Sequence, residues 1–131
     1  MNRFLSRITL TGFLLSVALA SAACSVAAVA VEPATLGPVD PNAVKVVASG
    51  QQFTTTQVNA AAGKAFQLAF ESQTSDPHNV AISRDGAEAT FRSDVFSGPA
   101  TRTYQVGALS AGTYTFICDV HPGMKGTLTV K

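Results

Sequence analysis

Apolar and polar residues alternate along short stretches of this chain, and the alternation restricts its fold more than any other feature. Phe66, Leu68 and Phe70 alternate with Gln67 and Ala69, so the three large side chains are expected on one face of a strand. Turn signals containing glycine or proline separate this stretch from others like it. The expected strands are residues 43–48, 53–58, 66–70, 78–82, 101–106, 113–118 and 126–131. Seven or eight short strands of this kind predict an all-β chain that folds as an antiparallel β-sandwich.

The inward positions of these strands predict one hydrophobic core, formed by Phe66, Leu68, Phe70, Ile82, Tyr104, Phe116, Leu128 and Val130. Residues 88–97 follow no clear period and are expected to form a short helix or an irregular crossover loop. Tyr114 follows a glycine turn. It is either a corner tyrosine, whose hydroxyl bonds back to the backbone, or an ordinary core residue.

The N-terminus has the order of a secretory signal over residues 1–23. Arg3 and Arg7 give it a positive start, residues 8–20 are largely apolar, and small residues follow. The apolar run is short for a membrane span. The alternative is an N-terminal helix that is retained as an anchor. We therefore expect an exported protein, in the periplasm or held at the outer face of the membrane.

Cys24 follows this segment at the place where a bacterial lipoprotein carries its lipid. The preceding residues resemble a lipobox, although Ser21 stands where leucine is usual, and ordinary cleavage after Ala22 fits equally well. Residues 24–42 are rich in alanine, valine and proline and predict a tether. Part of it, near residues 36–39, could lie against the domain as an edge. The folded domain is then expected over residues 43–131.

The low charge of the chain limits the partners that it can bind. Charged residues make up 13% of the chain, the formal net charge is +1, and no basic stripe is present, so nucleic acid is not an expected partner. Loss of residues 1–23 removes two arginines and no acid, which makes the charge −1. So small a net charge is expected to attract a charged partner protein only weakly at long range. Docking through an apolar contact is therefore favoured.

The chemistry of the chain is concentrated in the loop between its last two expected strands. Cys118, His121 and Met124 lie within seven residues there, and the other histidine, His78, lies on an expected strand. Two imidazoles and a thiolate with a weak axial thioether are the ligands of a blue-copper site. Zinc gains little from a thioether, and iron–sulfur clusters need more thiolates. The four residues therefore predict one copper ion that cycles between Cu(I) and Cu(II).

The same residues carry a resemblance. His78-Asn79-Val80, followed by Tyr114-Thr115-Phe116-Ile117-Cys118-x-x-His121-x-x-Met124-x-Gly126, resembles the cupredoxins of the plastocyanin and amicyanin type. The resemblance covers residues 43–131. It implies a Greek-key sandwich with copper at one end, and transient one-electron exchange with a donor and an acceptor protein. It also implies that the electron leaves through His121.

The same resemblance draws attention to three residues near the expected ligands. Asn79 matches the family residue that joins the two ligand loops. Asp119 stands where serine or threonine is frequent, and it is expected to be a solvated loop acid. Val120 stands where proline is frequent, so its amide is expected to be free to bond to the Cys118 sulfur.

Two other functions compete with electron transfer. Cys118, His121 and Asp119 could form a nucleophile, base and orienting acid, but neighbouring loop residues rarely reach that geometry, and Met124 would have no role. We therefore expect no enzyme. A copper chaperone or storage protein is the stronger alternative, although such proteins usually expose methionine-rich or histidine-rich clusters, which this chain lacks. We expect the chain to be a monomer.

Overall fold

A computed structural model describes residues 29–35 and 37–131 of the chain. Eleven strands and no helix occur in that part: β1 (Val44–Ser49), β2 (Gln52–Phe53), β3 (Gln57–Ala60), β4 (Phe66–Ser72), β5 (Pro77–His78), β6 (Ala81–Ser83), β7 (Phe91–Arg92), β8 (Phe96–Ser97), β9 (Ala100–Val106), β10 (Gly112–Ile117) and β11 (Lys125–Val130). The predicted signal and Cys24 lie outside the described residues. Within the described ranges, the structure contains no helix that is long and apolar enough to cross a membrane.

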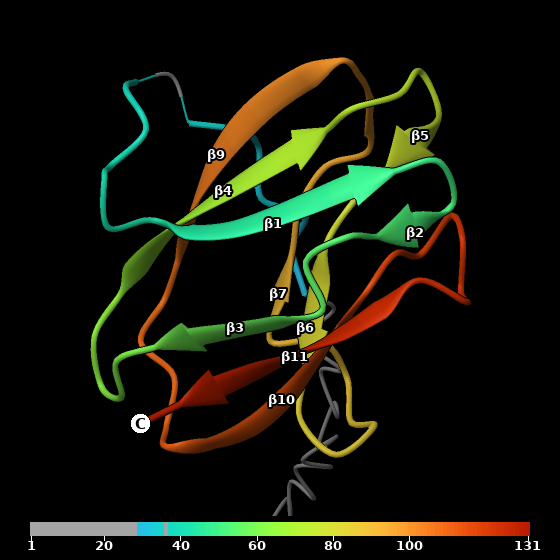
Figure 1. Cartoon of the computed structure of the whole chain (residues 1–131). Helices are drawn as coiled ribbons and strands as arrows, with labels where there is room; N and C mark the ends of the chain where they lie inside the picture. The colour runs from blue at the N-terminus through green and yellow to red at the C-terminus, as the bar shows by residue number, and fades with distance from the viewer. Residues whose placement is uncertain (1–28, 36) are drawn as a thin grey trace, which may run out of the picture.

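The strands form two facing sheets and a small third one, which confirms the predicted all-β sandwich (Figure 1). The first sheet has the order β2-β1-β4-β9 and the second β3-β11-β10-β6-β7, while β5 pairs with β8. Most neighbours are antiparallel, but β1 pairs with β4 and β11 with β3 in parallel. The sandwich, predicted as antiparallel, therefore also contains two parallel strand pairs. The chain crosses to the second sheet through β3 before it returns as β4, so β4 runs in the direction of β1.

Two of the expected strands are split, which raises the count above the predicted seven or eight. Residues 53–58 divide into β2, at the edge of the first sheet, and β3, at the edge of the second. Residues 78–82 divide into β5 and β6. Residues 88–97, for which a helix or a crossover loop was expected, contain the short strands β7 and β8 and no helix. Alternation does not show where a strand leaves one sheet for the other, because both inner faces are equally apolar.

The core lies between the two sheets and contains every residue predicted for it, with Phe66 at its partly buried margin. Aromatic rings join the layers edge to face: the Phe53 and Phe116 centroids are 5.2 Å apart, and those of Phe70 and Phe96 are 5.3 Å apart. Tyr114 is a corner tyrosine, since its hydroxyl donates to the Ser110 carbonyl at 3.0 Å. This core makes a rigid base for the loops at its end.

Part of the predicted tether lies against the domain. The Glu32 amide donates to the Arg92 carbonyl at 2.7 Å, and the Glu32 carbonyl accepts from the Asp94 amide at 3.1 Å. Three residues later, the Thr35 amide donates to the Thr103 carbonyl at 2.7 Å. The segment therefore joins β7, an edge of the second sheet, to β9, an edge of the first. Edge strands benefit from such cover because their backbone groups otherwise remain unpaired.

Candidate metal centre

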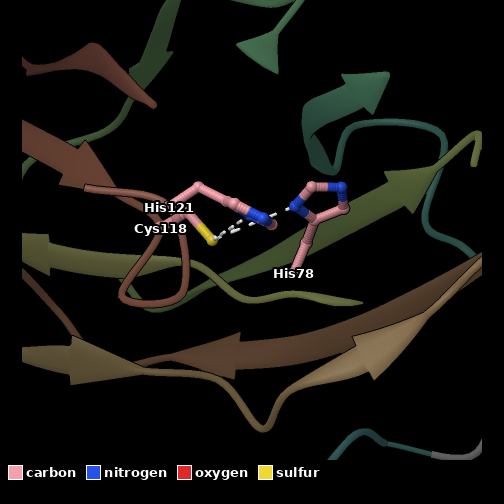
Figure 2. Close-up of side chains that lie close together, drawn as sticks. All are labelled: His78, Cys118 and His121. Atoms are coloured by element: carbon pink, nitrogen blue, oxygen red, sulfur yellow. Dashed lines mark hydrogen bonds between the residues drawn. The ribbon is translucent and has the colours of Figure 1, made fainter. Parts of the chain in front are cut away.

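Three of the four predicted ligands converge at one end of the sandwich. His78 ends β5, Cys118 directly follows β10, and His121 lies in the loop that leads to β11. Figure 2 shows both imidazole rings directed at the cysteine sulfur. The Cys118 Sγ atom is 4.0 Å from His78 Nδ1 and 3.9 Å from His121 Nδ1. The three donor atoms lie within 4.8 Å of one another.

The loop itself brings Met124 to the same place. The Met124 amide donates to the His121 carbonyl at 2.9 Å, and the Cys118 amide donates to the Met124 carbonyl at 3.2 Å. These two bonds close the loop into a compact turn. Met124 is 2% exposed and belongs to the same core cluster as Cys118. The Met124 backbone is therefore next to Cys118, and the Met124 side chain is buried at the same end of the core.

Burial differs sharply among the four side chains. His78 and Cys118 are both 0% exposed, whereas His121 is only partly buried. The residues that follow His121, Pro122 and Gly123, are exposed. Only the His121 ring can thus connect the buried cluster to the surface of the described domain at this end.

The surroundings of the His78 imidazole favour its neutral form, which can give an electron pair to a metal ion. Burial lowers the pKa of His78 below its usual value, and the neighbouring His121 lowers this pKa further. Its Nε2 atom is buried and has no hydrogen-bond partner among the described residues, while its Nδ1 atom faces the sulfur. A neutral imidazole with Nδ1 unprotonated is the form that binds a metal ion.

The donor set fits a copper ion. Separations of 3.9 and 4.0 Å between sulfur and nitrogen are too long for strong hydrogen bonds. They agree with two atoms bound to one ion at about 2.0–2.3 Å each, the lengths usual for imidazole and thiolate ligands. A thiolate and two imidazoles with a weak thioether suit the Cu(I)/Cu(II) pair. The described residues contain no other such group of histidine, cysteine and acidic side chains.

The link between the two ligand segments is present and more extensive than predicted. Asn79 Oδ1 accepts from the Asp119 amide at 2.8 Å, and Asn79 Nδ2 donates to the Asp119 carboxylate at 2.6 Å. The same carboxylate forms an ion pair with Arg92 of β7. Asp119 is exposed, as expected of a loop acid, but its carboxylate is also paired, which was not predicted. Sequence reasoning missed Arg92, because nothing in the sequence indicates that β7 lies beside this loop.

The Val120 amide is not seen in its predicted role. In the described part of the chain, the polar contacts found at Cys118 Sγ are those with the two imidazoles. Val120 is 39% exposed and is one of the few large apolar residues of the described chain that lie at the surface. Val120 is thus better placed to contribute to the surface beside His121 than to bond to the sulfur.

Comparison with known proteins agrees with the fold and the donor set. The cupredoxin-like domain family matches residues 13–130. Plastocyanin A/B of Petroselinum crispum is 33% identical over 89 residues, covering 63% of this chain and 90% of that protein. Amicyanin-alpha of Methylorubrum extorquens is 35% identical over 120 residues, covering 91% and 96%. The chain therefore belongs to the cupredoxin-like family.

A solved structure shows the same fold at lower identity. Auracyanin A of Chloroflexus aurantiacus, described as a blue copper protein, superimposes with a TM-score of 0.59 at 21% identity. The match covers 72% of this chain and 100% of that one. It supports the two-sheet architecture seen in Figure 1.

Proposed function

We propose that His78, Cys118, His121 and Met124 hold one copper ion, through which the protein carries single electrons between larger redox proteins. The observation that carries this proposal is the convergence of both Nδ1 atoms on a fully buried thiol. Plastocyanin and amicyanin relatives support the same function. The bound copper supplies a Cu(I)/Cu(II) couple.

The residues around the site are suited to a fast change of oxidation state. Fast transfer requires that the ligands move little, and here they are held from both sides. His78 is fixed by the pairing of β5 with β8, and Cys118 by the closed turn that ends at Met124. Burial of Cys118 and Met124 also excludes water from the thiolate and the thioether. The protein thus contributes a rigid, dry set of ligands.

His121 is the proposed route for the electron to the surface. It is the one partly exposed member of the four, and the neighbouring Val120, Pro122 and Gly123 are exposed without carrying charge. An apolar contact with a partner would bring that partner close to the imidazole edge. We infer transient docking at this surface, by a protein that acts as a monomer and not as an enzyme.

Burial argues against the alternative of a copper chaperone or a storage protein. Transfer of the ion itself requires ligands that an acceptor can reach, and the thiol of Cys118 and the side chain of Met124 are enclosed. Transfer of an electron requires only the edge of one ligand. The described geometry therefore favours a carrier.

Export and the limits of the folded domain complete the proposal. A lone cysteine is exposed to oxidation outside the cytoplasm, and its use as a metal ligand explains its presence in an exported protein. Export agrees with residues 1–23 as a signal. Cys24 is then either a lipid attachment point or part of a free N-terminus. We place the start of the domain near residue 32 and not at residue 43, since Glu32 and Thr35 pair with its edges.

A visible spectrum tests the copper site. Purified protein loaded with one equivalent of Cu(II) is expected to show the intense blue band of a thiolate-to-copper transition. Cys118→Ser should lose this band entirely, whereas Asn59→Ser, on strand β3, should retain it. Colourless wild-type protein, or a blue Cys118→Ser protein, would contradict the assignment.

A further inference from the structure

Arg92 lies at a junction that joins three parts of the molecule at the copper end. It belongs to β7, and its backbone pairs with Ala81 of β6. On the other side, its carbonyl accepts the Glu32 amide at 2.7 Å. Both sides of this strand are thus occupied by backbone bonds. The base of the Arg92 side chain is fixed, although the side chain itself is 33% exposed.

From this base the guanidinium reaches the residue that directly follows Cys118. Arg92 Nη1 forms an ion pair with Asp119 Oδ2, the oxygen that also accepts the 2.6 Å bond from Asn79. The Asp119 amide donates to Asn79 Oδ1 at 2.8 Å. Asn79 follows His78, and Asp119 follows Cys118. The carboxylate therefore ties together the backbone segments that carry two of the proposed ligands.

The charge of Asp119 explains why a cation is needed. A carboxylate one residue from a thiolate adds negative charge close to the proposed metal site. Alone, it would favour the more positive oxidation state of the metal and would repel the thiolate. It would also leave Oδ2 accepting only from the neutral Asn79 amide. Arg92 compensates the charge and, with a directed N–H group, fixes the orientation of the carboxylate.

We propose that Arg92 is a positioning residue for the copper site, acting through Asp119 to hold the Cys118 loop against the His78 segment and to neutralise the carboxylate. The inference rests on the proposed function. It concerns this chain's own pair of residues, in which aspartate takes a position that cupredoxins often fill with an uncharged hydroxyl. Outer residues that orient metal ligands commonly change metal affinity by about 10–100-fold when they are replaced.

The test uses four variants of the full chain. Arg92→Met removes the charge but keeps an unbranched, flexible side chain, and Arg92→Lys keeps a charge without the planar fork. Asp119→Ser removes the need for a cation while leaving an oxygen that can accept from Asn79. The double variant Arg92→Met/Asp119→Ser completes a mutant cycle. Lys45→Met is the matched control, because it breaks the Lys45–Glu71 pair, which links β1 to β4.

Copper release and reduction potential are the informative measurements. Arg92→Met should release copper to a chelator at least about tenfold faster than wild type. Its potential should fall, and more at low salt, because both partners of the pair are about one third exposed and ions screen the residual charge. Arg92→Lys should recover part of both properties. The double variant should release copper within about twofold of Asp119→Ser, since the cation then has nothing to compensate.

Two results would overturn the inference. One is Arg92→Met protein that matches Lys45→Met in copper release and in potential. The other is a double variant that remains as impaired as Arg92→Met, which would show that Arg92 acts independently of Asp119. Thermal unfolding of the metal-free variants gives a separate readout: Arg92 and Asp119 should show coupling there, even if wild-type protein bound no copper and the proposed function failed.

Discussion

Replacement of Gly126 by alanine should destabilise the domain and distort the ligand loop. Gly126 lies opposite Phe116 in the β10–β11 pair, and a Cβ atom at Gly126 would stand 2.1 Å from Phe116 Cζ and 2.6 Å from Cε2. Neither distance is tolerable, so the ring must move. Phe116 is 1% exposed, and its centroid lies 5.2 Å from that of Phe53, which blocks the ring.

The expected loss follows from this overpacking. Added atoms in a packed core typically destabilise by about 1–3 kcal/mol. For a domain of roughly 100 residues, each kcal/mol lowers Tm by about 4–8 °C, so a fall of about 8–16 °C is expected for a 2 kcal/mol loss. Because Gly126 is two residues beyond Met124, the copper spectrum should change as well.

Urea or thermal unfolding followed by circular dichroism measures this effect. Gly123→Ala is the control, since Gly123 lies in the loop just before β11 and a Cβ there would meet nothing within 4 Å. Gly126→Ala/Phe116→Leu should lose less stability than the sum of its single variants, because the smaller side chain makes room for the methyl group. Gly126→Ala protein as stable as Gly123→Ala would refute the reasoning.

Three further predictions concern the copper site. Met124→Leu should keep the blue colour and raise the reduction potential, because loss of the weak axial thioether destabilises Cu(II); a colourless protein that no longer holds copper would contradict the axial role. Removal of copper by a chelator should lower Tm but preserve the β-sheet circular dichroism signal, since the core is complete without the ion. Val120→Lys should slow electron self-exchange, measured by NMR line broadening, without moving the potential, and an unchanged rate would place docking elsewhere on the surface.

Local sequence patterns were sufficient to predict most of the strands and the core. The alternation that includes Phe66, Leu68 and Phe70 reappears as β4, and Leu68 and Phe70 are buried as expected. Alternation reports which residues face inward, and burial of apolar surface drives that arrangement in any sandwich. It does not report strand order. The parallel β1–β4 pair and the split of residues 53–58 between two sheets depend on how the chain crosses the core.

The residues of the proposed copper site were also predictable from local sequence patterns. Cys118, His121 and Met124 are predictable as a group because their short spacing forces them together in any tight turn. His78 was identifiable because it is the other histidine of the chain, and because its neighbour Asn79 matches a known motif. These are properties of composition and spacing, which a linear sequence contains in full.

Contacts between distant segments were decided by the tertiary structure alone. The pair of Arg92 and Asp119 joins β7 to the loop after β10, across a separation that no period or motif spans. Whether an acid at position 119 finds a cationic partner depends on which strand lies beside the loop. That placement results from the packing of two complete sheets. The sequence thus determined the donor set of the proposed metal site, whereas the fold determined the charges and hydrogen bonds that hold those donors in place.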